Sequence, residues 1–257
     1  MEETYQDYVN RVARLTLPAN YKTQLENIQP SPKYKEGVAV SFPGHSIITP
    51  PWQDDSENAV FYSNLEQYQK QLLQQLDSGL IIPVESNSFH LTLADLIWDS
   101  GYLEAVKENP EFDSKLQESI AGSFANYCES VTKGYPIAWQ LLGLTIRPRA
   151  IIVCLVPKDQ ESYDRILQLR RCIYQNSALI GLGIEQQYNF TGHITLGYFA
   201  EIPENLDRDR LIKTLSEFND RFLETEPQML NVQQAQLRKF DDMLTYYRQP
   251  DWPVLEF

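Results

Sequence analysis

Two stretches of the sequence decide how this chain folds: SFHLTLADLIW at residues 88–98 and GHITLGYF at residues 192–199. Both contain His, an aliphatic residue, Thr and Leu in that order, although the chain has only three histidines. Aliphatic and β-branched residues dominate both stretches, which favours strands. Residues i and i+2 of a strand point to one face, so His90 and His193 each project beside the threonine two positions later. The sequence therefore predicts two strands that each present an imidazole and a hydroxyl together.

The elements around the two motifs follow the same order. Each His–Thr strand is preceded by a strand and a helix, and is followed by another helix and another strand. Apolar residues at helical spacing indicate four of these helices, near residues 65–76, 113–131, 163–173 and 211–222. The end of the chain, around residues 231–249, is expected to form a closing hairpin.

This repeated order predicts a duplicated α+β fold with two lobes. Each lobe would hold an antiparallel sheet with helices on the outside, and a pseudo-twofold axis would relate the lobes around a central cleft. We expect a single bilobal domain with a helical extension at residues 1–36, a first lobe at 37–135 and a second at 136–257. In this arrangement the two His–Thr pairs would meet in the cleft.

The charge of the chain limits its partners. With 22 Lys and Arg against 35 Asp and Glu, the formal net charge is −13, which opposes binding along a long duplex nucleic acid. A small substrate or the end of a larger one is expected instead. No apolar run is long enough to cross a bilayer, and the first residues are polar, so we expect neither membrane association nor a signal peptide. Three scattered cysteines favour reduced thiols and a cytoplasmic location. We also expect a monomer.

Two histidines and two threonines in one cleft suit displacement at phosphorus. One imidazole can remove a proton from the attacking oxygen while the other donates a proton to the leaving oxygen. The hydroxyls of Thr92 and Thr195 can bind the non-bridging oxygens as charge develops. No metal-binding or cofactor-binding motif is visible, so neither a metal nor a cofactor is expected.

The paired HLTL and HITL motifs, an HxTx pattern repeated in a duplicated α+β arrangement, resemble the 2H phosphoesterase superfamily. Its members include 2′,3′-cyclic nucleotide phosphodiesterases and LigT proteins. The stretch VAVSFPGHSIIT before the first motif is similar to a little-characterised bacterial branch, and the resemblance covers roughly residues 37–240. It implies a bilobal fold and a metal-free phosphodiester reaction but no single substrate, since the members differ in theirs. We expect hydrolysis of a 2′,3′-cyclic phosphate on a nucleotide or RNA end. His193 would be the general base and His90 the general acid, although the symmetry of the site leaves this order open.

Four further residues are candidates for substrate contact. Ser88 shares the face of His90, and His45 follows a Pro-Gly turn from which it would reach either the cleft or solvent. Phe199 shares the strand parity of His193 and could stack on a base. Tyr198 would point to the core, unless Gly197 introduces a bulge.

Two arginines, Arg147 and Arg149, occupy a predicted turn from which they could meet a phosphate, although we expect the turn to be solvated. Two alternative functions remain open at this stage. The first is a 2′–5′ phosphodiesterase or ligase-type enzyme that uses the same site. The second is a non-catalytic nucleotide-binding module that keeps the fold.

Overall fold

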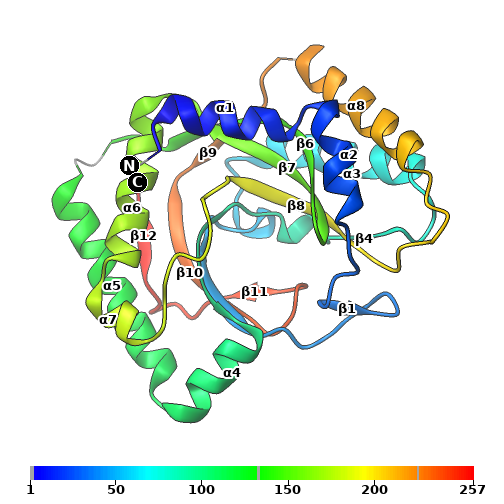
Figure 1. The fold of residues 1–257 in the computed structure, drawn as a ribbon. Coiled ribbons are helices and arrows are strands. Elements are labelled where there is room, and N and C mark those ends of the chain that lie inside the picture. Colours follow the sequence, from blue (N-terminus) through cyan, green and yellow to red (C-terminus); the bar gives the residue numbers. More distant parts are fainter. Residues whose placement is uncertain (1–2, 132–133, 225) are drawn as a thin grey trace.

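The computed structural model describes residues 3–131, 134–224 and 226–257. Within these ranges the chain forms two five-stranded sheets and a separate two-stranded hairpin, and every strand pairing is antiparallel. Helices lie around the outside of the sheets (Figure 1). The predicted α+β class, with two antiparallel sheets and outer helices, is confirmed.

The first sheet carries the strand that follows His90. Its strands run in the spatial order β11, β10, β3, β5, and β12 also pairs with β10. Their bounds are β3 Gly44–Ile48, β5 Thr92–Trp98, β10 Gln234–Phe240, β11 Tyr246–Tyr247 and β12 Val254–Glu256. The predicted closing hairpin is confirmed, because β10 and β11 are antiparallel neighbours.

The second sheet carries His193 at the start of β8. Its spatial order is β4, β8, β7, β6, β9. The bounds are β4 Ile81–Pro83, β6 Ile137–Arg147, β7 Ala150–Pro157, β8 His193–Phe199 and β9 Met229–Val232. All residues of β7 are buried, which explains why its sequence is an uninterrupted apolar run.

Each sheet draws strands from both sides of residue 135. The short strand β4 leaves the first half to pair with β8, while β10, β11 and β12 return from the end of the chain to the first sheet. The sequence did not predict this exchange, because strand pairing across most of the chain leaves no local signal. The division of the chain into lobes at residue 135 stays a prediction.

The helices cover the sheets in two groups. In Figure 1, α1, α2 and α8 lie over the second sheet, where they contact β6 and β7. Helices α4, α5, α6 and α7 form the other group: α4 contacts β5, α5 contacts β12, and α6 contacts β5 of the first sheet and β6 and β7 of the second. The bounds are α1 Tyr5–Leu15, α2 Pro18–Glu26, α3 Ala59–Gln75, α4 Asp99–Glu108, α5 Phe112–Ser130, α6 Gln160–Tyr174, α7 Ser177–Gly181 and α8 Arg208–Glu224, with single 3₁₀ turns at Trp52–Asp54 and Ser86–Ser88. No helix in the described ranges is long and apolar enough to span a membrane.

Local chemistry sets several helix boundaries. Thr4 caps α1 through its side chain, which accepts a hydrogen bond from the Asp7 amide. Pro18 then opens α2, since proline fits the first turn of a helix but not its interior. The N-terminal extension therefore contains two helices. Val38–Ala39, at the start of the predicted first lobe, forms a hairpin with Tyr34–Lys35 and belongs to neither five-stranded sheet.

Candidate functional site

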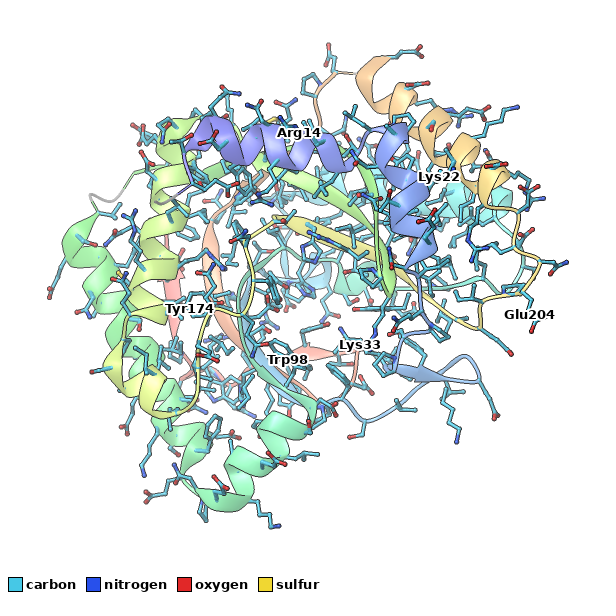
Figure 2. All side chains as sticks on the ribbon, in the orientation of Figure 1. Arg14, Lys22, Lys33, Trp98, Tyr174 and Glu204 are labelled. Atoms are coloured by element: carbon cyan, nitrogen blue, oxygen red, sulfur yellow. The ribbon has the colours of Figure 1, made fainter. Side chains whose placement is uncertain are left out.

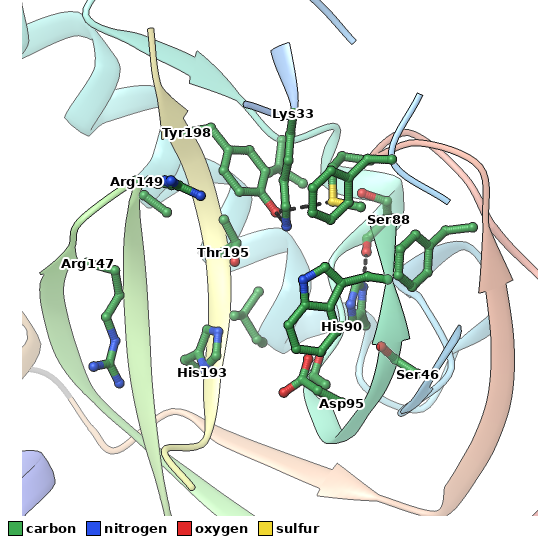
Figure 3. A pocket seen from close by; sticks show the side chains of 18 of the residues that line it. Lys33, Ser46, Ser88, His90, Asp95, Arg147, Arg149, His193, Thr195 and Tyr198 are labelled. Atoms are coloured by element: carbon green, nitrogen blue, oxygen red, sulfur yellow. Dashed lines mark hydrogen bonds between the residues drawn. The ribbon is translucent and has the colours of Figure 1, made fainter. Parts of the chain in front are cut away.

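A cavity of about 600 Å³ lies between the two sheets. Its lining includes His90 and Thr92 from the first sheet side and His193 and Thr195 from β8. Figure 3 shows the two histidines approaching this pocket from opposite strands. The cavity is within the range of small-molecule sites, roughly 300–1,000 Å³. The structure thus brings together the four residues of the two motifs.

Both histidines are held by the same backbone contact. The ring nitrogen Nδ1 of His90 lies 2.7 Å from the carbonyl oxygen of Ser88, and Nδ1 of His193 lies 2.7 Å from that of Thr191. A carbonyl can only accept, so each Nδ1 carries a proton and donates it. In the neutral imidazole, Nε2 is then the atom with a free lone pair. Neither Nε2 has a hydrogen-bond partner among the described residues.

The surroundings of the two imidazoles disfavour their charged forms. Burial is the largest cause that lowers the pKa of His90 to about 4; the charges of His193, Lys33 and Arg238 act in the same direction, and the hydrogen bond to Ser88 opposes them. Burial also lowers the pKa of His193, and the nearby Arg147 adds to the effect. Both imidazoles are therefore neutral in the free protein near pH 7.

The ring of His90 is also fixed by an aromatic neighbour. Its centroid lies 4.3 Å from that of Tyr246 on β11, with 58° between the ring planes. Ser88, which ends a 3₁₀ turn, lines the cavity as predicted, but its hydroxyl donates to the Glu85 carbonyl 2.8 Å away. Its own carbonyl orients His90. The strand begins at Thr92 and not at Ser88, because that turn precedes it.

The threonine hydroxyls are free to bind a ligand. Thr92 and Thr195 both line the cavity and are half-buried. Neither hydroxyl makes a hydrogen bond to a residue in the described ranges. Each lies beside an imidazole, so the cavity offers two hydroxyls and two Nε2 atoms to one bound group.

A bulge in β8 reverses the predicted roles of Tyr198 and Phe199. Thr195 pairs with Ile152, but Gly197 pairs with Ile151, so Leu196 is an extra residue in the strand. Alternation is shifted by one position beyond it. Tyr198 therefore lines the cavity, whereas Phe199 is fully buried in the core and does not. The prediction that Phe199 could stack on a substrate is wrong.

His45 is also misplaced by the sequence analysis. Its side chain is 0% exposed and is absent from the cavity lining, so neither predicted position, cleft or solvent, is correct. Its Nε2 lies 3.2 Å from a carboxylate oxygen of Asp113, and its ring packs against Tyr102 and Trp252. Helix α5 supplies Asp113, which the local sequence around His45 could not reveal.

Sequence reasoning missed Lys33 in the cavity lining. Lys33 comes from the N-terminal extension, and its Nζ lies 3.3 Å from the Tyr198 hydroxyl and over the Tyr198 and Phe42 rings. Arg147 and Arg149 also line the cavity, and the predicted turn is present between them, with Pro148 and Arg149 exposed. These three side chains are accompanied by a single carboxylate in the described lining, Asp95, which accepts a hydrogen bond from Tyr188. The site is thus cationic within an acidic chain.

Comparison with known proteins gives the fold. No family model and no curated protein matches the sequence. A conserved protein of unknown function from Agrobacterium tumefaciens has a similar structure, with a TM-score of 0.61 at 15% identity over 90% of this chain and 96% of that one. A structure described as a phosphoesterase (TM-score 0.41, 14% identity, 84% and 95% covered) and E. coli LigT complexed with 3′-AMP (0.41, 13%, 85% and 96%) also match. LigT and phosphoesterase structures are thus among its structural neighbours.

Replacing Lys33 by Met is expected to raise the pKa of both His90 and His193. The positive charge of Lys33 lowers both values, so its removal makes each imidazolium less unfavourable. The measurement is an NMR titration of the ring protons, which is simple because the chain has three histidines. Lys35→Met, at an exposed position outside the cavity, is the matched control. Unchanged values for both cavity histidines would contradict this electrostatic role.

Proposed function

We propose that this protein is a metal-independent phosphodiesterase that hydrolyses a 2′,3′-cyclic phosphate on a nucleotide or RNA end. The observation that carries the proposal is the pair of imidazoles in one cavity. Each has Nδ1 donating to a carbonyl, and its Nε2 has no hydrogen-bond partner within the described part of the chain. Such an arrangement supplies one proton acceptor and, once the second ring is protonated, one proton donor.

The reaction needs two proton transfers at opposite oxygens. His193 Nε2 removes a proton from water as the water oxygen forms a bond to phosphorus. The bond from phosphorus to O2′ or O3′ breaks, and His90 gives its Nε2 proton to the leaving oxygen. The product is a phosphomonoester beside a free ribose hydroxyl. Thr92 and Thr195 donate hydrogen bonds to the non-bridging oxygens, where negative charge grows.

The lowered histidine pKa values fit this cycle when the substrate is bound. A phosphodiester brings a negative charge between the rings, and an opposite charge at short range favours an imidazolium. Binding therefore raises the pKa of the pair and helps one ring to carry the proton that the leaving oxygen receives. Lys33 faces the same space and stabilises the anion.

The proposal is tested by turnover of a panel of substrates. Adenosine 2′,3′-cyclic phosphate is expected to be hydrolysed, with 2′–5′ and 3′–5′ linked dinucleotides as comparisons. Preference for the 2′–5′ dinucleotide would instead favour a 2′–5′ phosphodiesterase on the same site. Calorimetric binding of the cyclic nucleotide without turnover of any member would favour the non-catalytic binding module.

Activity is expected to persist in excess EDTA, because the imidazoles perform both proton transfers in this mechanism. Among the described residues, no group of three or more His, Cys, Asp and Glu is arranged to hold a metal ion. The measurement compares initial rates before and after chelation and dialysis. Loss of the rate, with recovery on adding one particular divalent ion, would overturn the metal-independent mechanism.

A further inference from the structure

The turn between β6 and β7 carries two arginines whose charge the proposed hydrolysis does not use. Arg147 and Arg149 both line the cavity. Within the described ranges, neither guanidinium has a hydrogen-bond or ion-pair partner. Carboxylates outnumber basic side chains by 35 to 22 in this sequence, so two unpaired arginines on one short turn call for an explanation.

The turn that carries these arginines is fixed on both sides. Arg147 and Ala150 close the β6–β7 hairpin as an antiparallel pair. The carbonyl of Pro148 accepts a hydrogen bond of 2.7 Å from the Gln29 amide, and that of Arg149 accepts one of 3.0 Å from the Phe199 amide. The N-terminal segment and β8 therefore hold in place the backbone of the turn that carries both guanidinium groups.

Their position places them beside the histidine pair but not within it. Figure 3 shows Arg147 and Arg149 on the side of β8 that lies away from His90. Arg147 is half-buried and lowers the pKa of His193, whereas Arg149 is exposed at the rim of the cavity. The reacting phosphate between the two imidazoles would leave these cations free for a second anionic group.

We infer that Arg147 and Arg149 form a second anion subsite, which takes a second phosphate of the substrate. Guanidinium groups bind phosphate through paired, charge-assisted hydrogen bonds, which are stronger than neutral ones. This inference rests on the proposed function and narrows it. The substrate would be a nucleotide with a 2′,3′-cyclic phosphate and a further phosphate, either at its own 5′ position or as the linkage to a preceding nucleotide.

The kinetic test compares three substrates: adenosine 2′,3′-cyclic phosphate, its 5′-phosphorylated form, and the dinucleotide ApA with a terminal 2′,3′-cyclic phosphate. We expect kcat/KM to be at least about 10-fold higher for one or both of the substrates with a second phosphate, a gain typical of hydrogen bonds to charged groups. Comparison of the 5′-phosphorylated nucleotide with the dinucleotide shows whether the second phosphate is a terminal 5′-phosphate or an internucleotide linkage.

The double variant Arg147→Gln/Arg149→Gln is expected to bring towards one the ratio of kcat/KM for a substrate with a second phosphate to kcat/KM for adenosine 2′,3′-cyclic phosphate. A matched double variant, Arg14→Gln/Lys22→Gln, removes the same charge from exposed positions on α1 and α2 (Figure 2), and neither residue lines the cavity. The matched variant should keep the ratio of the unmodified protein. A ratio near one in the unmodified protein, or an equal fall in both variants, would overturn the subsite.

A binding measurement keeps this inference separate from the proposed reaction. Calorimetry with adenosine 3′,5′-bisphosphate and adenosine 3′-monophosphate needs no turnover. The bisphosphate should bind about 10-fold more tightly, and the arginine double variant should lose this difference. Tighter binding that depends on the arginines, in a protein that hydrolyses nothing, would retain the subsite and reject the phosphodiesterase. Equal binding of the two nucleotides, in a protein that hydrolyses the cyclic phosphate, would do the reverse.

Discussion

Replacing His90 or His193 by alanine is expected to lower kcat for a 2′,3′-cyclic nucleotide by roughly 10²–10⁴-fold, the usual contribution of a positioned acid or base. The two losses should not multiply in the double variant, because both rings act in one transition state. Thr92→Val and Thr195→Val should each cost less, since each removes one hydrogen bond to developing charge. Steady-state kinetics on proteins with matched thermal unfolding curves gives the comparison.

The third histidine supplies the control. His45 lies outside the cavity and pairs with Asp113, so His45→Gln should lower the melting temperature while the folded protein keeps its kcat. A His90→Ala/His193→Ala protein that folds and retains full turnover would disprove the mechanism. A similar loss of kcat in the His45 variant would show instead that the measured losses report stability.

An activated phosphodiester separates the acid from the base. A p-nitrophenolate leaving group needs no proton, so the loss caused by removing the general acid should shrink with a p-nitrophenyl ester of a nucleotide. In the assignment proposed here, the kcat of the His90→Ala variant would recover with this ester, and the kcat of the His193→Ala variant would not. Recovery of the His193 variant alone would reverse the two roles while leaving the paired-imidazole chemistry intact.

The pH profile of the unmodified protein should be bell-shaped, since one ring must be neutral while the other is charged. Burial lowers the pKa of His90 to about 4 and also lowers that of His193. Both limbs of the kcat/KM profile, which reports the free enzyme, should therefore lie below the ordinary imidazole range. The kcat profile should be displaced to higher pH, because bound phosphate raises the pKa of the pair. The two apparent pKa values that the limbs give belong to the coupled pair of histidines and not to either residue alone.

The central pairs of the site could be predicted because they depend on local rules. Strand periodicity places His193 beside Thr195, and the repeated motif indicated that His90 and Thr92 would meet them. The same periodicity failed at Tyr198, since one extra residue in β8 shifts every later side chain to the other face. The sequence analysis named a bulge at Gly197 as the exception that would reverse Tyr198, but no local signal decided it.

The remaining parts of the site depend on pairing between distant segments. Lys33 reaches the cavity because its segment packs along β8, where the Ser31 amide donates a 2.9 Å hydrogen bond to the Phe199 carbonyl. Arg147 and Arg149 resemble any charged hairpin turn in sequence, and only the packing of this turn beside β8 places them in the cavity lining. His45 is hidden by α5. Helix and strand patterns carry no information about such contacts, which tertiary packing alone determines.

Gly197 links the fold to the site, and Gly197→Ala is expected to destabilise the protein by about 1–3 kcal/mol, as over-packing of a dense interior does. A Cβ at this position would overlap Ile81 Cγ2 and would lie 2.9 Å from the carbonyl oxygen of Ile82. The second contact is backbone of β4, which pairs directly with β8. Relief therefore requires the two strands to separate, and a side-chain rotation would not suffice.

The matched control for this substitution is Gly181→Ala. Gly181 ends the short helix α7, and a Cβ there would meet nothing within 4 Å. That change should be neutral or slightly stabilising, because alanine loses less backbone entropy than glycine in a helix. Chemical denaturation of both variants measures the difference.

Because Tyr198 follows Gly197 and holds Lys33 through its hydroxyl, the Gly197 variant should also raise KM for the cyclic nucleotide. Equal free energies of unfolding for the two variants would show that β4 can shift to accommodate an added methyl group. Close packing at Gly197 would then not determine the path of β8 beside the cavity.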